Sequence, residues 1–219
     1  MDAPVNSPNF SRLMPCICSV DTRRDRQQAH AQQFNDLSSF RDLTFDTFND
    51  TVPGTRDAFQ AALDYAENPD GWLVLVGDYG CGKTHLAAAI ANHTKQEMGM
   101  SPILAVVPDL LDYLRTTFGP NSESTYDERF NAFRGADLLI LDDLGTESAT
   151  PWAREKLFQI INHRYIERAP LVVTTNDLDR IEPRVRSRLT DWQLARHIFI
   201  DATDFRDRLG RKRSARPSR

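Results

Sequence analysis

Cysteine and long apolar runs are both scarce in this sequence. Its 219 residues contain 3 cysteines, which are too few for a disulfide scaffold, and we expect them to be reduced thiols. Two of them, Cys16 and Cys18, cannot complete a tetrahedral zinc site without ligands from another chain. No apolar run approaches the roughly 18 to 20 residues that cross a bilayer, and residues 1–20 lack the apolar core of a secretory signal. We therefore expect a cytoplasmic protein that makes no membrane contact.

Excess basic charge is absent from most of the chain. Lys and Arg number 27 against 31 Asp and Glu, which gives a net charge of −4. Seven of these basic residues, with one Asp, lie in residues 206–219. Such a run can bind phosphate backbones or can simply be a solvated end, and the sequence leaves both possibilities open.

The length indicates one full domain with short additions, at roughly 150 residues per domain. Residues 1–40 are polar, and we expect a short N-terminal appendage that is partly disordered or helical. Residues 41–204 carry the apolar patterns of a folded domain. Residues 205–219 are predicted to form a basic, disordered tail.

Five short apolar runs alternate with helical patterns in the predicted domain. Runs of this kind suit strands that are covered on both faces, and the segments between them suit helical crossovers. The sequence therefore predicts an α/β fold, a three-layer sandwich around a parallel five-stranded sheet. The predicted strands are Trp72–Val76, Ile103–Val107, Leu138–Leu141, Leu171–Thr175 and His197–Ile200. Predicted helices cover Ala58–Ala66 and lie near residues 83–98, 109–118, 124–134 and 151–168.

A glycine-rich loop follows the first predicted strand and precedes a strong helix-forming segment. Its pattern, G-x-x-x-x-G-K-T, is that of a P-loop, whose backbone N–H groups surround phosphate oxygens at a helix N-terminus. We expect Lys83 to reach the β and γ phosphates of a nucleotide and the Thr84 hydroxyl to bind Mg²⁺. The predicted nucleotide-binding residues are Gly77, Asp78, Tyr79, Gly80, Cys81, Gly82, Lys83 and Thr84.

Two carboxylates follow the apolar run Leu138–Leu141, and an asparagine follows Leu171–Thr175. A carboxylate directly after a buried strand needs a partner for its charge, and Mg²⁺ is a natural one, so Asp142 is the predicted metal ligand together with Thr84. Asp143 is placed to orient or deprotonate the attacking water. Asn176 either forms a turn or holds that water at the same sheet edge, and the neighbouring motifs favour the second role.

Three arginines lie in the segment that Pro183 opens. In a helix, Arg184 and Arg188 share a face at a spacing of four residues, while Arg186 points elsewhere. Two like charges side by side suggest an anionic partner, such as the γ phosphate on a neighbouring subunit.

These motifs together resemble an AAA+ ATPase of the DnaC/DnaI helicase-loader and IstB family, over about residues 40–204. The resemblance implies the strand order 5-1-4-3-2, Mg²⁺-dependent hydrolysis of ATP that lies between subunits, Asn176 as the sensor, and Arg188 as the arginine finger, with Arg184 as a second candidate. Only about 15 residues follow Asp204, so we expect no C-terminal lid domain. The matching motifs are GDYGCGKTHLAAAIAN (Walker A), LLILDDLG (Walker B), VVTTN (sensor 1) and RVRSRL (arginine finger).

Two further segments bear a likeness to this family. Thr44–Phe48 resembles the aromatic segment at the start of the domain, and Pro108–Arg134 resembles the helical insertion that lines a DNA path in the initiator branch. The insertion has only three basic residues, so DNA contact would depend on many subunits and the tail.

The family resemblance leads to a principal functional hypothesis and two alternatives. The first is an ATP-dependent replication factor that assembles on single-stranded DNA and acts on a replicative helicase. The second is an IstB-like transposition helper whose partner is a transposase. The third, less favoured, is a small-molecule P-loop kinase, which the asparagine after the fourth strand argues against.

Overall fold

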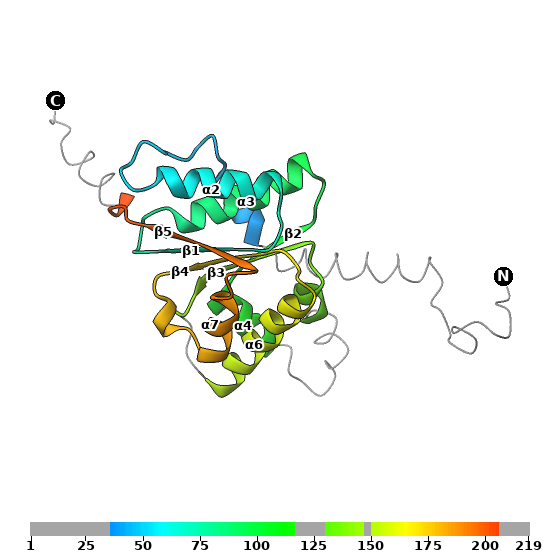
Figure 1. Cartoon of the computed structure of the whole chain (residues 1–219). Coiled ribbons are helices and arrows are strands. Elements are labelled where there is room, and N and C mark those ends of the chain that lie inside the picture. The colour runs from blue at the N-terminus through cyan, green and yellow to red at the C-terminus, as the bar shows by residue number, and fades with distance from the viewer. Residues whose placement is uncertain (1–35, 117–129, 147–149, 206–219) are drawn as a thin grey trace, which may run out of the picture.

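The computed structural model describes residues 36–116, 130–146 and 150–205, and these form an α/β domain (Figure 1). Residues 1–35 of the predicted appendage 1–40, with Cys16 and Cys18, and residues 206–219 of the predicted tail 205–219 lie outside the described residues. So does most of the predicted helix 124–134, of which residues 130–134 are described and helical. Among the described residues, no helix combines the length and apolarity needed to cross a bilayer.

All neighbouring strands of the five-stranded sheet run parallel, in the order β2-β3-β4-β1-β5. This is the predicted order read from the opposite edge, so the predicted fold is confirmed. The strands are β1 (Trp72–Gly77), β2 (Pro102–Val106), β3 (Leu138–Leu144), β4 (Leu171–Thr175) and β5 (Ala195–Ile200).

Helices cover both faces of the sheet (Figure 1). One face carries α2 (Arg56–Glu67), α3 (Lys83–Glu97) and the 3-10 turn η1 (Asp36–Phe40). The other face carries α4 (Val107–Thr116), α6 (Pro151–Ile166) and α7 (Pro183–Leu189), with η2 (Leu178–Arg180) leading into α7.

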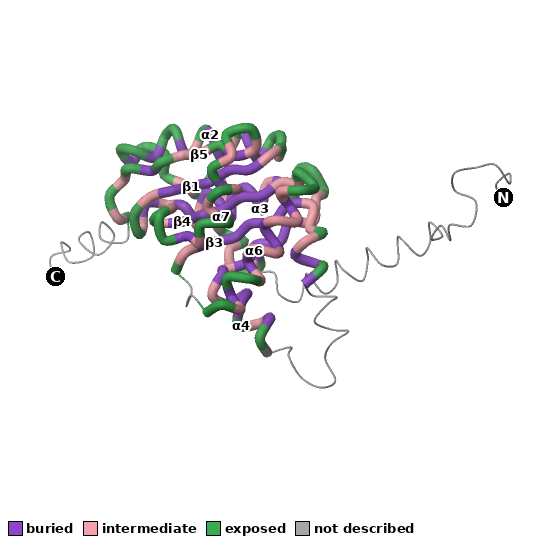
Figure 2. The backbone as a smooth tube through the Cα atoms, turned by 60° about the horizontal axis from the view of Figure 1, so that its bottom comes forward, coloured by how far each residue is buried: buried purple, intermediate pink, exposed green. Residues whose placement is uncertain are grey.

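Alternate residues of the central strands supply the two halves of the core. In β1, Leu73 and Leu75 pack toward α2 and α3, whereas Trp72 and Val74 pack toward α6 and α7. All four are buried, and in Figure 2 the buried segments run through the middle of the domain. Uniform apolarity in these strands therefore has the predicted cause, which is a helix layer on each face.

Local capping signals fix where α6 and α7 begin. Thr150 accepts the N–H of Ala153 through its hydroxyl at 3.2 Å, and Pro151 occupies the first turn. At α7 the Glu182 carboxylate accepts the N–H of Val185 at 3.1 Å, next to Pro183.

Five predicted strand boundaries need correction. β1 ends at Gly77 rather than Val76, and β2 begins at Pro102 rather than Ile103. β2 ends at Val106, because Val107 is already the first residue of α4. β3 continues to Leu144, past the two carboxylates. β5 begins at Ala195 rather than His197, since an edge strand can expose polar residues such as Arg196 that an apolar run does not include.

Candidate functional site

The loop between β1 and α3 has the backbone shape that its glycines permit. Gly80 and Gly82 have φ angles of 71° and 103°, in the left-handed region that residues with a Cβ rarely adopt. Gly82 is the last residue before α3, so the loop delivers its N–H groups to the N-terminus of a 15-residue helix. Loop amides and the helix N-terminus together favour an anion here.

The ammonium group of Lys83 lies inside this loop. Lys83 is only 7% exposed, and its Nζ donates to the carbonyl oxygens of Gly77 at 2.8 Å and Asp78 at 2.9 Å. Cys81 is buried beside it, with its Sγ 3.8 Å from Nζ. The loop therefore holds a desolvated positive charge next to the backbone that is shaped for an anion.

The Thr84 hydroxyl and the Asp142 carboxylate meet at the carboxyl end of the sheet. Thr84 Oγ1 donates to Asp142, with distances of 3.1 and 3.0 Å to the two carboxylate oxygens. Asp142 is 4% exposed, and burial is the largest influence on its pKa, which is raised despite the hydrogen bonds from Thr84 and Thr174. The structure thus brings together the two predicted metal ligands from α3 and β3.

Thr174 on β4 is a part of this site that the sequence analysis missed. Its hydroxyl donates to Asp142 Oδ1 at 2.6 Å and accepts the backbone N–H of Asp143 at 2.8 Å. The sequence shows only a threonine directly after the aliphatic run Leu171–Val173, and its 1% exposure becomes known from the structure. A buried hydroxyl there needs a partner, and the carboxylate supplies one.

Asp143 lies on a strand irregularity. The pairing of β3 with β4 shifts between Leu141 and Leu144, and Asp143 has a φ of 63°, unusual for a residue with a side chain. Its carboxylate accepts a hydrogen bond from the Thr146 hydroxyl at 3.2 Å. The irregularity turns two adjacent aspartates in different directions, one into the sheet edge and one toward the following loop.

Asn176 directly follows β4 at the same edge. Its side-chain Nδ2 is buried and has no hydrogen-bond partner within the described residues. An unpaired buried amide donor costs free energy, about 1–3 kcal/mol, and such a donor suits an acceptor that arrives with a ligand.

The arginines of α7 divide as their spacing predicts. Arg184 and Arg188 both stack on Phe158 of α6, with their guanidinium carbons 4.2 and 4.6 Å from the ring centre. Arg184 also pairs with Glu182 and Glu155, whereas Arg186 points away and pairs with Asp179.

Arg188 is fixed to its own domain by two hydrogen bonds. Its Nε donates to Asn162 Oδ1 at 2.9 Å and its NH1 to the Arg184 carbonyl at 2.8 Å. Within the described part of the chain, the side-chain hydrogen bonds of the α7 arginines go to residues of α6, η2 and α7 and to Glu182, and none goes to the phosphate loop.

The segment that precedes α2 closes over the loop from the other side. His85 Nε2 donates to the carbonyl oxygen of Thr44 at 2.9 Å and lies 3.2 Å from Thr47 Oγ1. Phe48 stacks on Phe59 and meets the His85 ring edge-on. His85 therefore has a packing role, and it ties the aromatic segment to α3.

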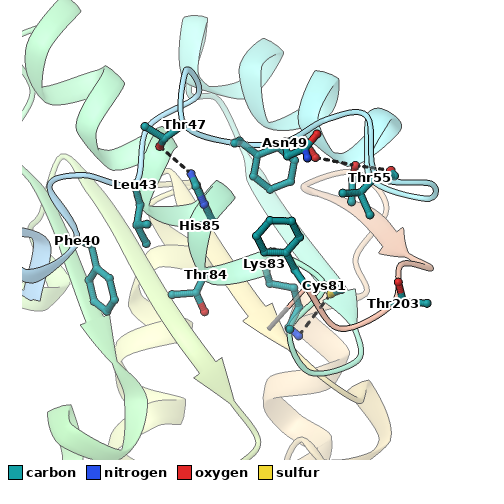
Figure 3. A pocket seen from close by; sticks show the side chains of 15 residues that line it. Phe40, Leu43, Thr47, Asn49, Thr55, Cys81, Lys83, Thr84, His85 and Thr203 are labelled. Atoms are coloured by element: carbon teal, nitrogen blue, oxygen red, sulfur yellow. Dashed lines mark hydrogen bonds between the residues drawn. The ribbon is translucent and has the colours of Figure 1, made fainter. Parts of the chain in front are cut away.

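A cavity of about 370 Å³ lies between the phosphate loop and these segments (Figure 3). Its size falls within the range usual for small-ligand sites, roughly 300–1,000 Å³. Figure 3 shows Lys83 and Cys81 between Phe40 on one side and Thr203 on the other. The lining residues are Phe40, Leu43, Thr47, Phe48, Asn49, Val52, Thr55, Gly80, Cys81, Gly82, Lys83, Thr84, His85, Thr203 and Phe205.

Comparisons with known proteins show the family of this chain. The family model described as IstB-like ATP binding protein matches residues 17–198. The chromosomal replication initiator protein DnaA of Neisseria gonorrhoeae is 32% identical over 182 residues, 80% of this chain and 34% of that protein. The replicative helicase loader DnaI of Bacillus subtilis is 29% identical over 168 residues, 73% of this chain and 53% of that protein. The chain thus spans about a third to a half of the length of these relatives.

Two solved structures share the fold. The crystal structure of the DnaC helicase loader matches with a TM-score of 0.66 at 23% identity, covering 74% of this chain and 99% of that one. The replication initiator DnaA bound to AMPPCP and single-stranded DNA matches with a TM-score of 0.64 at 23% identity, covering 78% of this chain and 54% of that one.

Proposed function

Because the chain belongs to the AAA+ family of IstB-like ATP-binding proteins, we propose that it is a Mg²⁺-dependent ATPase that acts in DNA replication as a helicase loader. In this role it assembles on single-stranded DNA and acts on a replicative helicase. The single observation that carries the ATPase proposal is the meeting of Lys83, Thr84 and Asp142 at the edge where Asn176 offers an unpartnered donor.

The residues of the site fit ATP and Mg²⁺. The glycines let the loop curl so that its backbone N–H groups are available to an anion, and the Lys83 ammonium is buried beside them. Both features suit phosphate oxygens. The Thr84 hydroxyl and the Asp142 carboxylate are hard oxygen ligands at one point, which suits Mg²⁺. A bound Mg²⁺ ion supplies neutralisation of the charge that develops on phosphate oxygens.

Each side chain of the site has a separate role in hydrolysis. Lys83 exchanges its carbonyl partners for phosphate oxygens, since an ammonium gains more from a full negative charge than from a carbonyl dipole. Asp143 orients the attacking water or takes its proton, and the Asn176 amide donates to that water or to the γ phosphate. Thr174 holds the Asp142 carboxylate and the Asp143 backbone in place.

Self-association completes the proposed site. In the assembly Arg188, with Arg184 as the second candidate, would exchange its bonds within its own chain for the γ phosphate held by the neighbouring subunit. A guanidinium supplied in this way contributes roughly 10³ to 10⁵ in rate in related chemistry. The proposal is supported by the face that the two arginines share and by their contacts within the described residues, which are made with α6 and the start of α7.

The choice of partner rests on the relatives. DnaI is a replicative helicase loader, the solved DnaC structure is that of a helicase loader, and one solved DnaA structure contains single-stranded DNA. These support a replicative helicase and single-stranded DNA as partners of this chain. A second candidate function is an ATP-dependent transposition helper acting with a transposase, and the match to the IstB-like model favours it.

Loss of Lys83 tests the ATPase proposal. We expect Lys83→Ala to lose MgATP binding by at least about 100-fold in equilibrium dialysis and to lose phosphate release, because the buried charge of the loop is gone. The matched control is Lys95→Ala, which removes an exposed lysine from the same helix. Equal ATP affinity in wild type and Lys83→Ala would overturn the site assignment.

The partner is tested separately, by capture on the full-length chain with an ATP analogue present. Recovery of purified replicative helicase, lost in Lys83→Ala, supports the loader. Recovery of a purified transposase in its place supports the transposition helper and refutes the loader.

A further inference from the structure

The residues that follow β5 run directly across the phosphate loop. Residues 201–205, which we call the C-terminal segment, pass between the turn at Gly54 and the loop itself. A Cβ at Gly54 would collide with the carbonyl oxygen of Asp201, and a Cβ at Gly80 would collide with the Asp204 carboxylate. Two glycines far apart in sequence therefore leave room for this segment.

The position of Phe205 is set by the loop. Its backbone N–H donates to the carbonyl oxygen of Gly80 at 3.1 Å. The residue lines the cavity together with Thr203, yet it is 39% exposed. Phe205 belongs to neither apolar cluster, whereas Phe40 and Phe48, the other phenylalanines of the cavity, pack against the core.

The cavity has two chemically different parts. One end contains the loop amides, the Lys83 ammonium and the Thr84 hydroxyl, which suit phosphates. The rest is lined largely by apolar and aromatic side chains, among them Leu43, Val52 and Phe205. A ligand that carries phosphates on one end and a flat aromatic group on the other matches both parts.

We propose that Phe205 contacts the nucleobase of the bound nucleotide and that the C-terminal segment forms the outer wall of the base compartment. This inference rests on the proposed function, because it concerns the base of the ATP placed there. The Phe205 ring is 39% exposed, lies against the cavity and is positioned by a backbone hydrogen bond, and a base would cover apolar surface that is otherwise open to water. Base recognition is thereby linked to the phosphate loop through the Gly80 carbonyl.

The test compares ATP with inorganic tripolyphosphate, which has the phosphates but no base. We expect Phe205→Ala in the full-length chain to weaken ATP binding by about 5- to 150-fold, the range for loss of one base–aromatic contact, and to leave tripolyphosphate binding unchanged. Phe205→Tyr keeps the ring and retains ATP affinity. The control is Phe199→Ala, which removes a 70%-exposed phenylalanine of β5 that does not line the cavity.

Each other result overturns the inference. Unchanged ATP affinity in Phe205→Ala refutes the base contact. Equal weakening of both ligands shows that Phe205 acts through the loop alone. Because Phe205 lies outside the core, its variants should unfold at the wild-type temperature, and a lowered Tm refutes the premise of a peripheral ring. If wild-type chain binds neither ligand, the proposed function fails as well, so the two failures are distinguishable.

Discussion

Replacing Thr174 by valine removes one hydroxyl from the interior of the sheet at almost constant volume. That hydroxyl serves two groups, because it donates to Asp142 Oδ1 and accepts the Asp143 N–H. After the change, the Thr84 hydroxyl is the one side-chain donor that the described residues still offer to the buried carboxylate, and the Asp143 N–H faces a methyl group. Both groups lie where water has little access, since Thr174 is 1% exposed and Asp142 4%.

The size of the effect follows from these two losses. A hydrogen bond to a charged group contributes about 1.5–3 kcal/mol, and a buried N–H left unpaired costs about 1–3 kcal/mol. The two terms share one hydroxyl and are not additive, so we expect a loss of about 3 kcal/mol in the free energy of unfolding. At this chain length that corresponds to a fall in Tm of roughly 6–12 °C.

Thermal unfolding at neutral pH without nucleotide measures this loss, and Thr94→Val is the matched control. Thr94 is also fully buried, but its hydroxyl donates to the Ile90 and Ala91 carbonyls within α3. Those acceptors are neutral, and carbonyls within a helix also accept backbone N–H groups, so its loss should cost less than about 1 kcal/mol. Equal losses of unfolding free energy in the two variants would refute the argument that the Thr174 hydroxyl is hydrogen-bonded to a charged carboxylate.

Two further predictions concern the carboxylates and the arginines. Burial raises the pKa of Asp142, so the folded state binds the carboxyl proton more tightly than the unfolded state does. The free energy of unfolding therefore falls as the pH rises from the ordinary carboxyl pKa through the raised one. Chemical denaturation should therefore find Asp142→Asn more stable than wild type at neutral pH, with a flatter pH dependence, and a destabilised variant would contradict this. Arg188→Ala should keep ATP binding but lose most turnover, whereas Arg186→Ala keeps both. Mixing Arg188→Ala with Asp143→Asn chains should restore some phosphate release, and no recovery at any ratio would exclude action between subunits.

The fold was predictable because each strand of the sheet interior is covered on both sides. That arrangement makes the runs in β1, β3 and β4 uniformly apolar, so the pattern alone marks them as buried strands. The glycine-rich loop was predictable for a related reason, since its residue types satisfy a backbone requirement that can be stated without coordinates.

Contacts between distant segments were not predictable in this way. Thr174 becomes part of the site only through the register of β4 against β3, and a one-residue shift would turn its hydroxyl to the opposite face. Phe205 reaches the cavity through a backbone hydrogen bond to Gly80, which leaves no pattern in the sequence. Asp143 adopts a positive φ that no residue type in its neighbourhood signals.

The two ends of the sheet differ in whether their buried polar groups have hydrogen-bond partners. At the end where the strands begin, Arg164 is fully buried, but its guanidinium donates to the carbonyl oxygens of Arg134, Ala136 and Pro170. Such a group has its partners within the chain and serves to hold the segments that lead into β3 and β4.

At the end where the strands finish, several buried groups are left in unfavourable states. Asp142 is desolvated enough to raise its pKa, the Asn176 amide lacks a partner among the described residues, and Asp143 has a strained backbone. Strained backbone and unpaired polar groups lower stability, and proteins retain them mainly at functional sites. A ligand with several acceptor oxygens and a divalent cation relieves the first two together, so nucleotide should raise the Tm of wild type more than that of Asp142→Asn.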